Sequence, residues 1–95
     1  MKASLVIRER VVFGDGELVE MVVWRVPGPV PPATHLFKYR LVYIVGRRRI
    51  LGYDNERGKG DHRHAAGTEE PFMFTTIDEL LQRFVAEVEA IRSER

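Results

Sequence analysis

The C-terminal part of the chain carries the feature that most constrains the fold, a single amphipathic helix predicted to begin after Thr76. Thr76 is a good N-cap, and Glu79 three residues later completes a capping box. Beyond it the apolar side chains recur every three or four positions in one continuous stripe: Ile77, Leu80, Leu81, Phe84, Val85, Val88 and Ile91. One such helix covers one sheet face, so the opposite face is left for polar groups or for a partner.

The first half of the chain predicts the sheet on which this helix packs. Residues that are β-branched or aromatic are concentrated in four stretches, 4–13, 17–26, 35–45 and 49–54. Residues 14–16 suit a tight hairpin turn, whereas the proline-rich residues 27–32 form a stiff connector. We therefore predict one α+β domain over residues 1–95: an antiparallel sheet of four or five strands, built from two consecutive hairpins, with one C-terminal helix packed on one face. A fifth strand would come from residues 72–74.

The register of the second hairpin decides which polar residues meet. If residues 46–48 form a three-residue loop, Arg40 lies opposite Asp54 on the neighbouring strand, and Lys38 shares their sheet face. A two-residue loop would break this alignment. The prediction therefore depends on the assumed turn.

Charge and composition narrow the classes of function. The net charge is +1, but between Lys38 and His64 eight cationic residues stand against three acidic ones. A field of this kind attracts polyanions to one region of a protein. The chain has no cysteine, which excludes disulfide and thiolate chemistry and fits the cytoplasm. Its apolar runs are too short to span a membrane, and its charged start does not suit a signal peptide.

Residues 53–64 hold a dense group of ionisable side chains, including two of the three histidines. In an extended stretch His62 and His64 project the same way, so one can act as general base and the other as general acid. Asp54 would orient a histidine or an arginine, and Arg57 would stabilise charge on a phosphate. We predict these four residues as the catalytic set of a reaction that needs no cofactor.

Neighbouring residues are expected to bind the substrate. Arginine and lysine hold phosphate, and the glycines of this segment let backbone N–H groups approach an anion. The predicted substrate- and phosphate-binding set comprises Lys38, Arg40, Lys59, Arg63, Tyr53 and Asn55. Because residues 55–71 are long for a loop in a small domain, we expect them to form a functional loop.

Two other interpretations of the histidine pair stay open. His62 and His64, with Asp54 or Asp61, would supply two nitrogens and a carboxylate, enough to bind zinc or manganese in a metal-dependent phosphodiesterase. Alternatively, the histidines are exposed loop residues, and Asp54 and Asn55 only end a strand through side-chain caps.

Aromatic residues give a weaker signal. Trp24, Tyr39, Tyr43 and Tyr53 could stack on nucleic-acid bases. At strand positions, however, such residues more often pack in the core. We expect Phe72, Met73 and Phe74 to belong to the core too.

The chain resembles the TumE family, the toxin components of bacterial type II toxin–antitoxin systems. The resemblance is carried by Lys-Tyr-Arg-Leu at 38–41, by the pattern Tyr-Asp-Asn-x-x-Gly-x-x-x-His-x-His at 53–64, and by Glu-Glu-Pro-Phe at 69–72 before a short helix. The stretches 5–10 and 23–27 match as well. The resemblance implies a growth-inhibiting toxin that forms a complex with a helix-turn-helix antitoxin.

From the residues and the resemblance we predict a toxin that binds RNA and hydrolyses it as an endoribonuclease without metal. One alternative is a non-enzymatic module that inhibits by occupying nucleic acid or a protein target. Another is a subunit whose role is to pair with the antitoxin. The sequence leaves open the target RNA, cleavage versus nucleotide transfer, the oligomeric state and the surface that the antitoxin covers.

Overall fold

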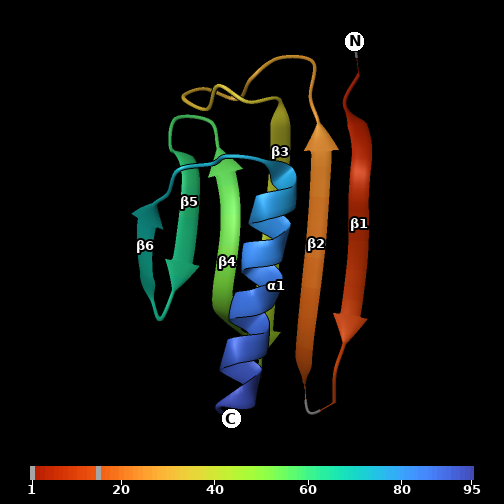
Figure 1. Cartoon of the computed structure of the whole chain (residues 1–95), viewed down its shortest axis with the longest axis vertical. Helices are drawn as coiled ribbons and strands as arrows, with labels where there is room; N and C mark the ends of the chain where they lie inside the picture. The colour runs from red at the N-terminus through yellow and green to blue at the C-terminus, as the bar shows by residue number, and fades with distance from the viewer. Residues whose placement is uncertain (1, 15) are drawn as a thin grey trace.

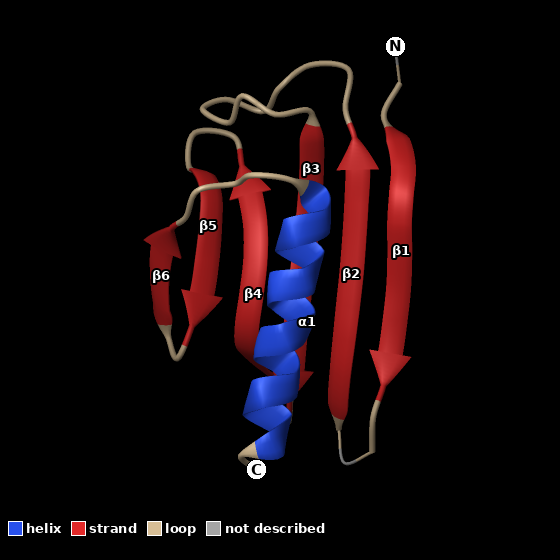
Figure 2. Cartoon of the chain, viewed as in Figure 1, coloured by secondary structure: helices blue, strands red, loops and turns tan. Residues whose placement is uncertain are grey.

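The computed structural model describes residues 2–14 and 16–95. Within them, six strands form one antiparallel sheet in chain order, and one helix lies across one face (Figures 1 and 2). The elements are β1 (Ser4–Val12), β2 (Glu17–Arg25), β3 (Phe37–Val45), β4 (Arg48–Glu56), β5 (Gly60–Ala65), β6 (Thr68–Pro71) and α1 (Ile77–Ser93). The predicted α+β class is confirmed. Asp15, at the centre of the predicted first turn, lies outside the described residues.

The strand count of four or five is wrong because residues 60–71, within the predicted long loop, form a β-hairpin. β5 pairs with β4 from Ala65 opposite Leu51 to Gly60 opposite Glu56, and β6 pairs with β5. This hairpin carries polar side chains on both faces, so it lacks the apolar alternation by which a strand is identified in a sequence. Residues 72–74, predicted as a strand, lie outside the sheet and connect β6 to α1.

The turn between β3 and β4 differs from the prediction, yet the predicted pairing is present. The turn contains two residues, Gly46 and Arg47, with φ angles of 56° and 69°. A β-bulge at Ile50 then inserts one unpaired residue into β4. The extra residue offsets the shorter turn, and Arg40 pairs with Asp54 as predicted.

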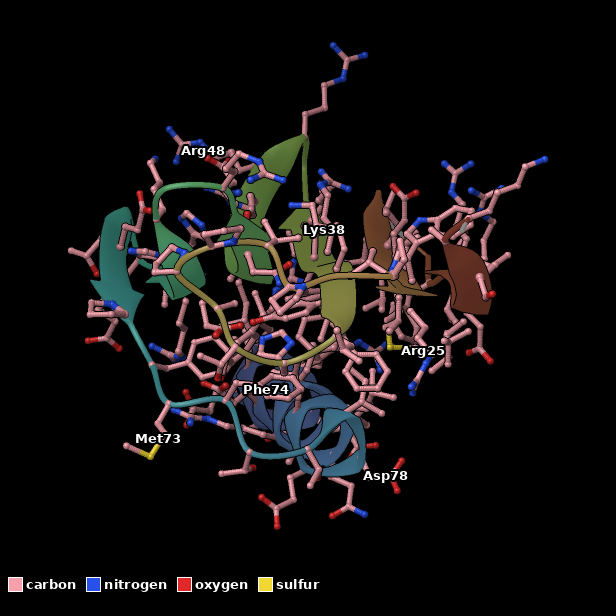
Figure 3. The ribbon with its side chains drawn as sticks, turned by 90° about the horizontal axis from the view of Figure 1, so that it is seen from above. Arg25, Lys38, Arg48, Met73, Phe74 and Asp78 are labelled. Carbon is pink, nitrogen blue, oxygen red and sulfur yellow. The ribbon has the colours of Figure 1, made fainter. Side chains whose placement is uncertain are left out.

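The hydrophobic core lies between the sheet and α1. Its buried residues come mainly from β2, β3, β4 and the helix: Val19, Val23, Tyr39, Leu41, Tyr43, Leu51, Tyr53, Leu80, Phe84 and Val88. Phe72 and Phe74 pack against this cluster, as predicted. Two predictions are wrong: Val85 is 41% exposed at the edge of the helical stripe, and Met73 is 85% exposed and points outward (Figure 3).

The helix begins as its sequence predicts. The Thr76 hydroxyl oxygen accepts a hydrogen bond from the backbone N–H of Glu79 at 3.1 Å, which satisfies a free donor of the first turn. Asp78 and Glu79 place negative charge at the positive end of the helix dipole. No helix in the described part of the chain is long and apolar enough to cross a lipid bilayer.

Candidate functional site

The sheet face that α1 leaves uncovered, here called the open face, carries the two histidines at the centre of the predicted site. Cross-strand pairing aligns Arg40, Asp54 and His62 in one row across β3, β4 and β5, and places His64 opposite Gly52 in the next row. Alternate residues of a strand point to the same side. The open face over β2 to β5 therefore includes Val22, Trp24, Lys38, Arg40, Val42, Gly52, Asp54, His62 and His64.

His64 lies between an arginine and a carboxylate. A terminal guanidinium nitrogen of Arg49 is 3.1 Å from Nδ1 of His64, and Nε2 is 3.4 Å from both carboxylate oxygens of Asp54. Since arginine can only donate, Nδ1 accepts and the ring proton sits on Nε2, facing Asp54. Glu69 approaches Nδ1 at 3.8 Å. The structure thus places Asp54 beside His64, and its role in orienting the imidazole stays a prediction.

Gly52 makes the approach of Arg49 to His64 possible. A Cβ atom at position 52 would lie 3.0 Å from Cδ of Arg49, closer than such atoms normally come. The aliphatic stem of Arg49 therefore crosses the strand over a residue that has no side chain. Sequence reasoning left Arg49 out of the site because the bulge at Ile50, which sets its direction, has no recognisable sequence signal.

His62 adopts the opposite tautomer. Its Nδ1 lies 3.1 Å from the carbonyl oxygen of Gly60, which can only accept, so Nδ1 carries the proton. Nε2 is then unprotonated in the neutral ring, and the nearest carboxylate oxygen, on Glu69, is 3.9 Å away. The two histidine side chains have similar exposed fractions, 16% for His62 and 15% for His64. An unprotonated Nε2 is the form that a general base requires.

A hollow of about 480 Å³ opens on this face, and a second one of about 170 Å³ lies beside His64. The larger is lined by Val22, Trp24, Lys38, Tyr39, Arg40, Arg49, Asp54 and Glu56. The smaller is lined by Arg49, His64, Ala65, Gly67, Thr68 and Glu69. Arg49 forms part of both walls, and it and Arg40 are exposed. The larger hollow is therefore bordered by three cationic side chains and by the carboxylates of Asp54 and Glu56.

Lys38 and Asn55 meet at the end of β4, but only Lys38 faces the hollow. Lys38 lies on the side of the sheet away from Phe74 and the helix (Figure 3), and its ammonium donates to the Asn55 carbonyl. The Asn55 side chain is fully buried, accepts from the Tyr39 N–H at 3.0 Å and donates to the Phe37 carbonyl at 2.7 Å. Asn55 thus continues the β3–β4 ladder and has no free group for phosphate.

Tyr53 and Arg63, both predicted to bind substrate, lie on the helix face. Tyr53 is buried, and its hydroxyl donates to Glu87 of α1. Arg63 donates to Glu87 and, at 3.3 Å, to Glu70. Burial and then the bond to Glu87 raise the pKa of Tyr53 to about 12. Burial acts to raise the pKa of Glu87, but hydrogen bonds from Arg63 and Tyr53 outweigh it and lower that pKa overall. This cluster ties the sheet to the helix.

Arg57 and Lys59, also predicted near the histidines, lie in the exposed turn between β4 and β5. The ammonium of Lys59 is 3.8 Å from Glu69 and therefore approaches the surroundings of the histidines. The Gly58 N–H donates to the carbonyl of Pro31 at 2.8 Å, which fixes the turn to the proline-rich connector. The structure places Arg57 at the end of the sheet, outside the row of Arg40, Asp54 and His62.

A partly buried cluster that sequence reasoning missed joins the third histidine to β5. Asp61 accepts from the Tyr39 hydroxyl at 2.6 Å and lies 2.9 Å from Nε2 of His35. Nδ1 of His35 accepts from the Phe37 N–H, and the ring stacks on Phe74 at 3.7 Å between centroids. Asp61 therefore faces the helix side, away from the histidine pair. Across residues 2–14 and 16–95, no group of three or more His, Cys, Asp or Glu side chains is arranged to hold a metal ion.

Fold and site together define a small α+β protein with an open sheet face on which cations and two histidines gather. Within that class the chain belongs to the TumE family: the family model described as Toxin TumE matches residues 2–92, which confirms the resemblance seen in the sequence. Comparison with curated proteins and with solved structures gave no match. Membership in this family makes the chain a toxin-family protein.

Proposed function

We propose that this protein is a growth-inhibiting toxin that cleaves RNA by attack of the 2′-hydroxyl on the adjacent phosphate. The observation that carries the proposal is the pair of complementary histidine tautomers on the open face, next to the hollow bordered by Arg40 and Arg49. Such a reaction needs a base, an acid and fixed positive charge around the phosphate. Metal and cofactor are not required.

His62 is assigned as the general base. Its Nε2 lone pair takes the proton from the 2′-hydroxyl, while Nδ1–H stays bonded to the Gly60 carbonyl and keeps the ring in this tautomer. The 2′-oxygen then forms a bond to phosphorus, and the bond from phosphorus to the 5′-oxygen breaks. The products are a 2′,3′-cyclic phosphate and a free 5′-hydroxyl end.

His64 is assigned as the general acid, and it needs a second proton before it can act. When a phosphate enters the hollow, Arg49 turns from Nδ1 of His64 to a phosphate oxygen, and the freed nitrogen takes up a proton from solvent. Asp54, at 3.4 Å, stabilises the resulting imidazolium. The imidazolium then gives a proton to the departing 5′-oxygen. Arg40 and Lys38 stabilise the charge that develops on the phosphate.

One observation favours a second candidate, inhibition by binding alone. Both ring nitrogens of His64 have partners, and Arg49 occupies the one that must be protonated. If Arg49 keeps this contact when RNA is bound, the open face holds RNA without cutting it. Arginine substitutions would then impair inhibition more than histidine substitutions, and binding would weaken steeply with salt.

We further infer an antitoxin partner, a helix-turn-helix protein made from the neighbouring gene. The family membership supports an antitoxin partner. Growth arrest on expression of the toxin, relieved when the neighbouring product is made in the same cell, is the expected result. Harmless expression of the toxin alone would instead favour a subunit whose role is to pair with the antitoxin.

Induced expression in bacteria tests the catalytic assignment. Wild type is compared with His62→Ala/His64→Ala, and growth and total RNA integrity are followed in the same cultures. Arrest with fragmented RNA for wild type only is expected. Purified wild type should also leave 2′,3′-cyclic phosphate ends on a synthetic RNA, and chelation of divalent metals should not stop it.

Arg47→Ala serves as the matched control, because Arg47 is an exposed residue of the β3–β4 turn. It should arrest growth as wild type does. Full toxicity of a folded double histidine variant would refute the proposed mechanism. Arrest with intact RNA would favour the binding alternative or another target.

A further inference from the structure

Trp24 is a large aromatic residue on the side of the sheet that has no helix. It lies in β2, opposite Leu5 of β1 and Lys38 of β3. Its chain neighbours Val23 and Arg25 point to the helix side, where Val23 is fully buried in the core. Trp24 itself is partly exposed. The sequence suggested a core role for this residue, but its side chain belongs to the open face.

The indole has a defined position beside the larger hollow. The guanidinium carbon of Arg8 on β1 lies 5.9 Å from its ring centroid, a cation–π contact. The ring also lines the hollow, whose cationic walls are Lys38, Arg40 and Arg49. An aromatic surface and three cations, together with the carboxylates of Asp54 and Glu56, therefore border one hollow of about 480 Å³.

This combination matches the chemistry of an unpaired nucleotide. Bases stack on aromatic rings whatever their sequence, while arginine and lysine bind the phosphates between them. Bases in a duplex are already stacked on one another and cannot reach an indole. A phosphate alone would use the cations and leave the indole untouched.

We propose that Trp24 is a base-stacking subsite for single-stranded RNA, which rests on the proposed ribonuclease function and defines its substrate class. From β2 to β5 the open face spans three strand spacings, on the order of 14 Å. A base on Trp24 is therefore a few nucleotides from the phosphate that His62 and His64 act on. The chain of the RNA crosses the sheet from Trp24 over Arg40 toward His64.

Trp24 is the only tryptophan of the chain, so its fluorescence reports this subsite alone. The His62→Ala/His64→Ala variant, which we expect to bind RNA without cutting it, is titrated with a short single-stranded oligoadenylate, a duplex RNA and inorganic phosphate. Strong quenching by the oligoadenylate only is expected. Equal quenching by duplex RNA, or none with any RNA, would overturn the assignment of the subsite.

Affinity provides the second measurement, by anisotropy of a labelled oligoadenylate. Trp24→Ala in the same histidine background should weaken binding about 5- to 150-fold, as expected for loss of one stacked base. Trp24→Phe should recover part of the loss, because a smaller ring still stacks. Val12→Ala, which removes an exposed side chain at the far end of β1, should leave affinity unchanged. Unchanged affinity in a folded Trp24→Ala variant would refute the subsite.

The two proposals fail in different ways. If the double histidine variant still cuts RNA, the catalytic assignment fails even when Trp24 is quenched. If the histidines are required but Trp24 is neither quenched nor needed for affinity, the ribonuclease stands and only the subsite is wrong.

Discussion

The Arg49 guanidinium donates to Nδ1 of His64 at 3.1 Å, and the Arg49 side chain passes over Gly52, which lies on the same strand as Arg49. The pairing has two effects. It places the ring proton of His64 on the nitrogen that faces Asp54, and it positions a cation between the two hollows of the open face. Catalysis by His64 and phosphate binding by Arg49 are therefore coupled in the proposed mechanism. Arg49 must leave Nδ1 of His64 before the imidazole can carry a second proton.

Gly52→Ala should disrupt this pairing. The new Cβ would lie 3.0 Å from Cδ of Arg49, and a flexible arginine can move away. Nitrogen-15 NMR of the imidazoles should show His64 as the Nε2–H tautomer in wild type and a mixture in the variant. Arg49→Ala should give the same change. A tautomer that stays fixed in both variants would show that Arg49 does not control it.

Asn55→Ala should destabilise the fold. The substitution leaves the Tyr39 N–H and the Phe37 carbonyl in the protein interior without their side-chain partner. We expect the free energy of unfolding to fall by roughly 2–4 kcal/mol. Urea denaturation measures it. Arg57→Ala, two residues away in the exposed turn, should change stability by less than about 0.5 kcal/mol. Similar losses in the two variants would contradict a structural role for Asn55.

Stability should fall in acid through Glu87. Its folded-state pKa lies below the ordinary 4.5, since hydrogen bonds from Arg63 and Tyr53 outweigh the effect of burial. The contribution of Glu87 is therefore present above pH 4.5 and is lost as pH falls through the folded pKa. Glu87→Gln should flatten the acid limb of the unfolding free energy. An unchanged slope would mean that other carboxyls produce it.

Stability should also fall at high pH through Tyr53. Burial, followed by the bond to Glu87, raises its pKa from 10 to about 12. The unfolded chain therefore ionises first, and the contribution of Tyr53 is present below pH 10 and lost as pH rises toward 12. Tyr53→Phe should reduce this slope. Burial also raises the pKa of Tyr39, so part of the slope should persist.

Arg47→Gly should stabilise the protein. Arg47 has a φ angle of 69°, a left-handed conformation that costs an ordinary residue energy, whereas glycine adopts it freely. The expected gain is about 0.5–1 kcal/mol after the added entropy of the unfolded chain is counted. Arg48→Gly, the next residue and the first of β4, should destabilise instead. A loss for Arg47→Gly would contradict the turn geometry.

The sequence alone determined the elements whose apolar side chains repeat with a clear period. The helical stripe from Ile77 to Ile91 and the alternation in residues 35–45 each specify a buried face, because hydrophobic burial acts on the pattern itself. The N-cap at Thr76 also follows from local residues. The Tyr-Asp-Asn to His-x-His pattern was specific enough to identify the family.

Only the tertiary structure decided the remaining positions, because they depend on strand register and not on local pattern. β5 and β6 carry polar side chains on both faces and are stabilised by backbone pairing that the sequence does not display. Strand alternation sends Arg63 to Glu87 while its neighbours His62 and His64 face the other way. The bulge at Ile50 restores the pairing of Arg40 and directs Arg49 to the site. A shift of one residue in any of these pairings would have turned each side chain to the opposite face.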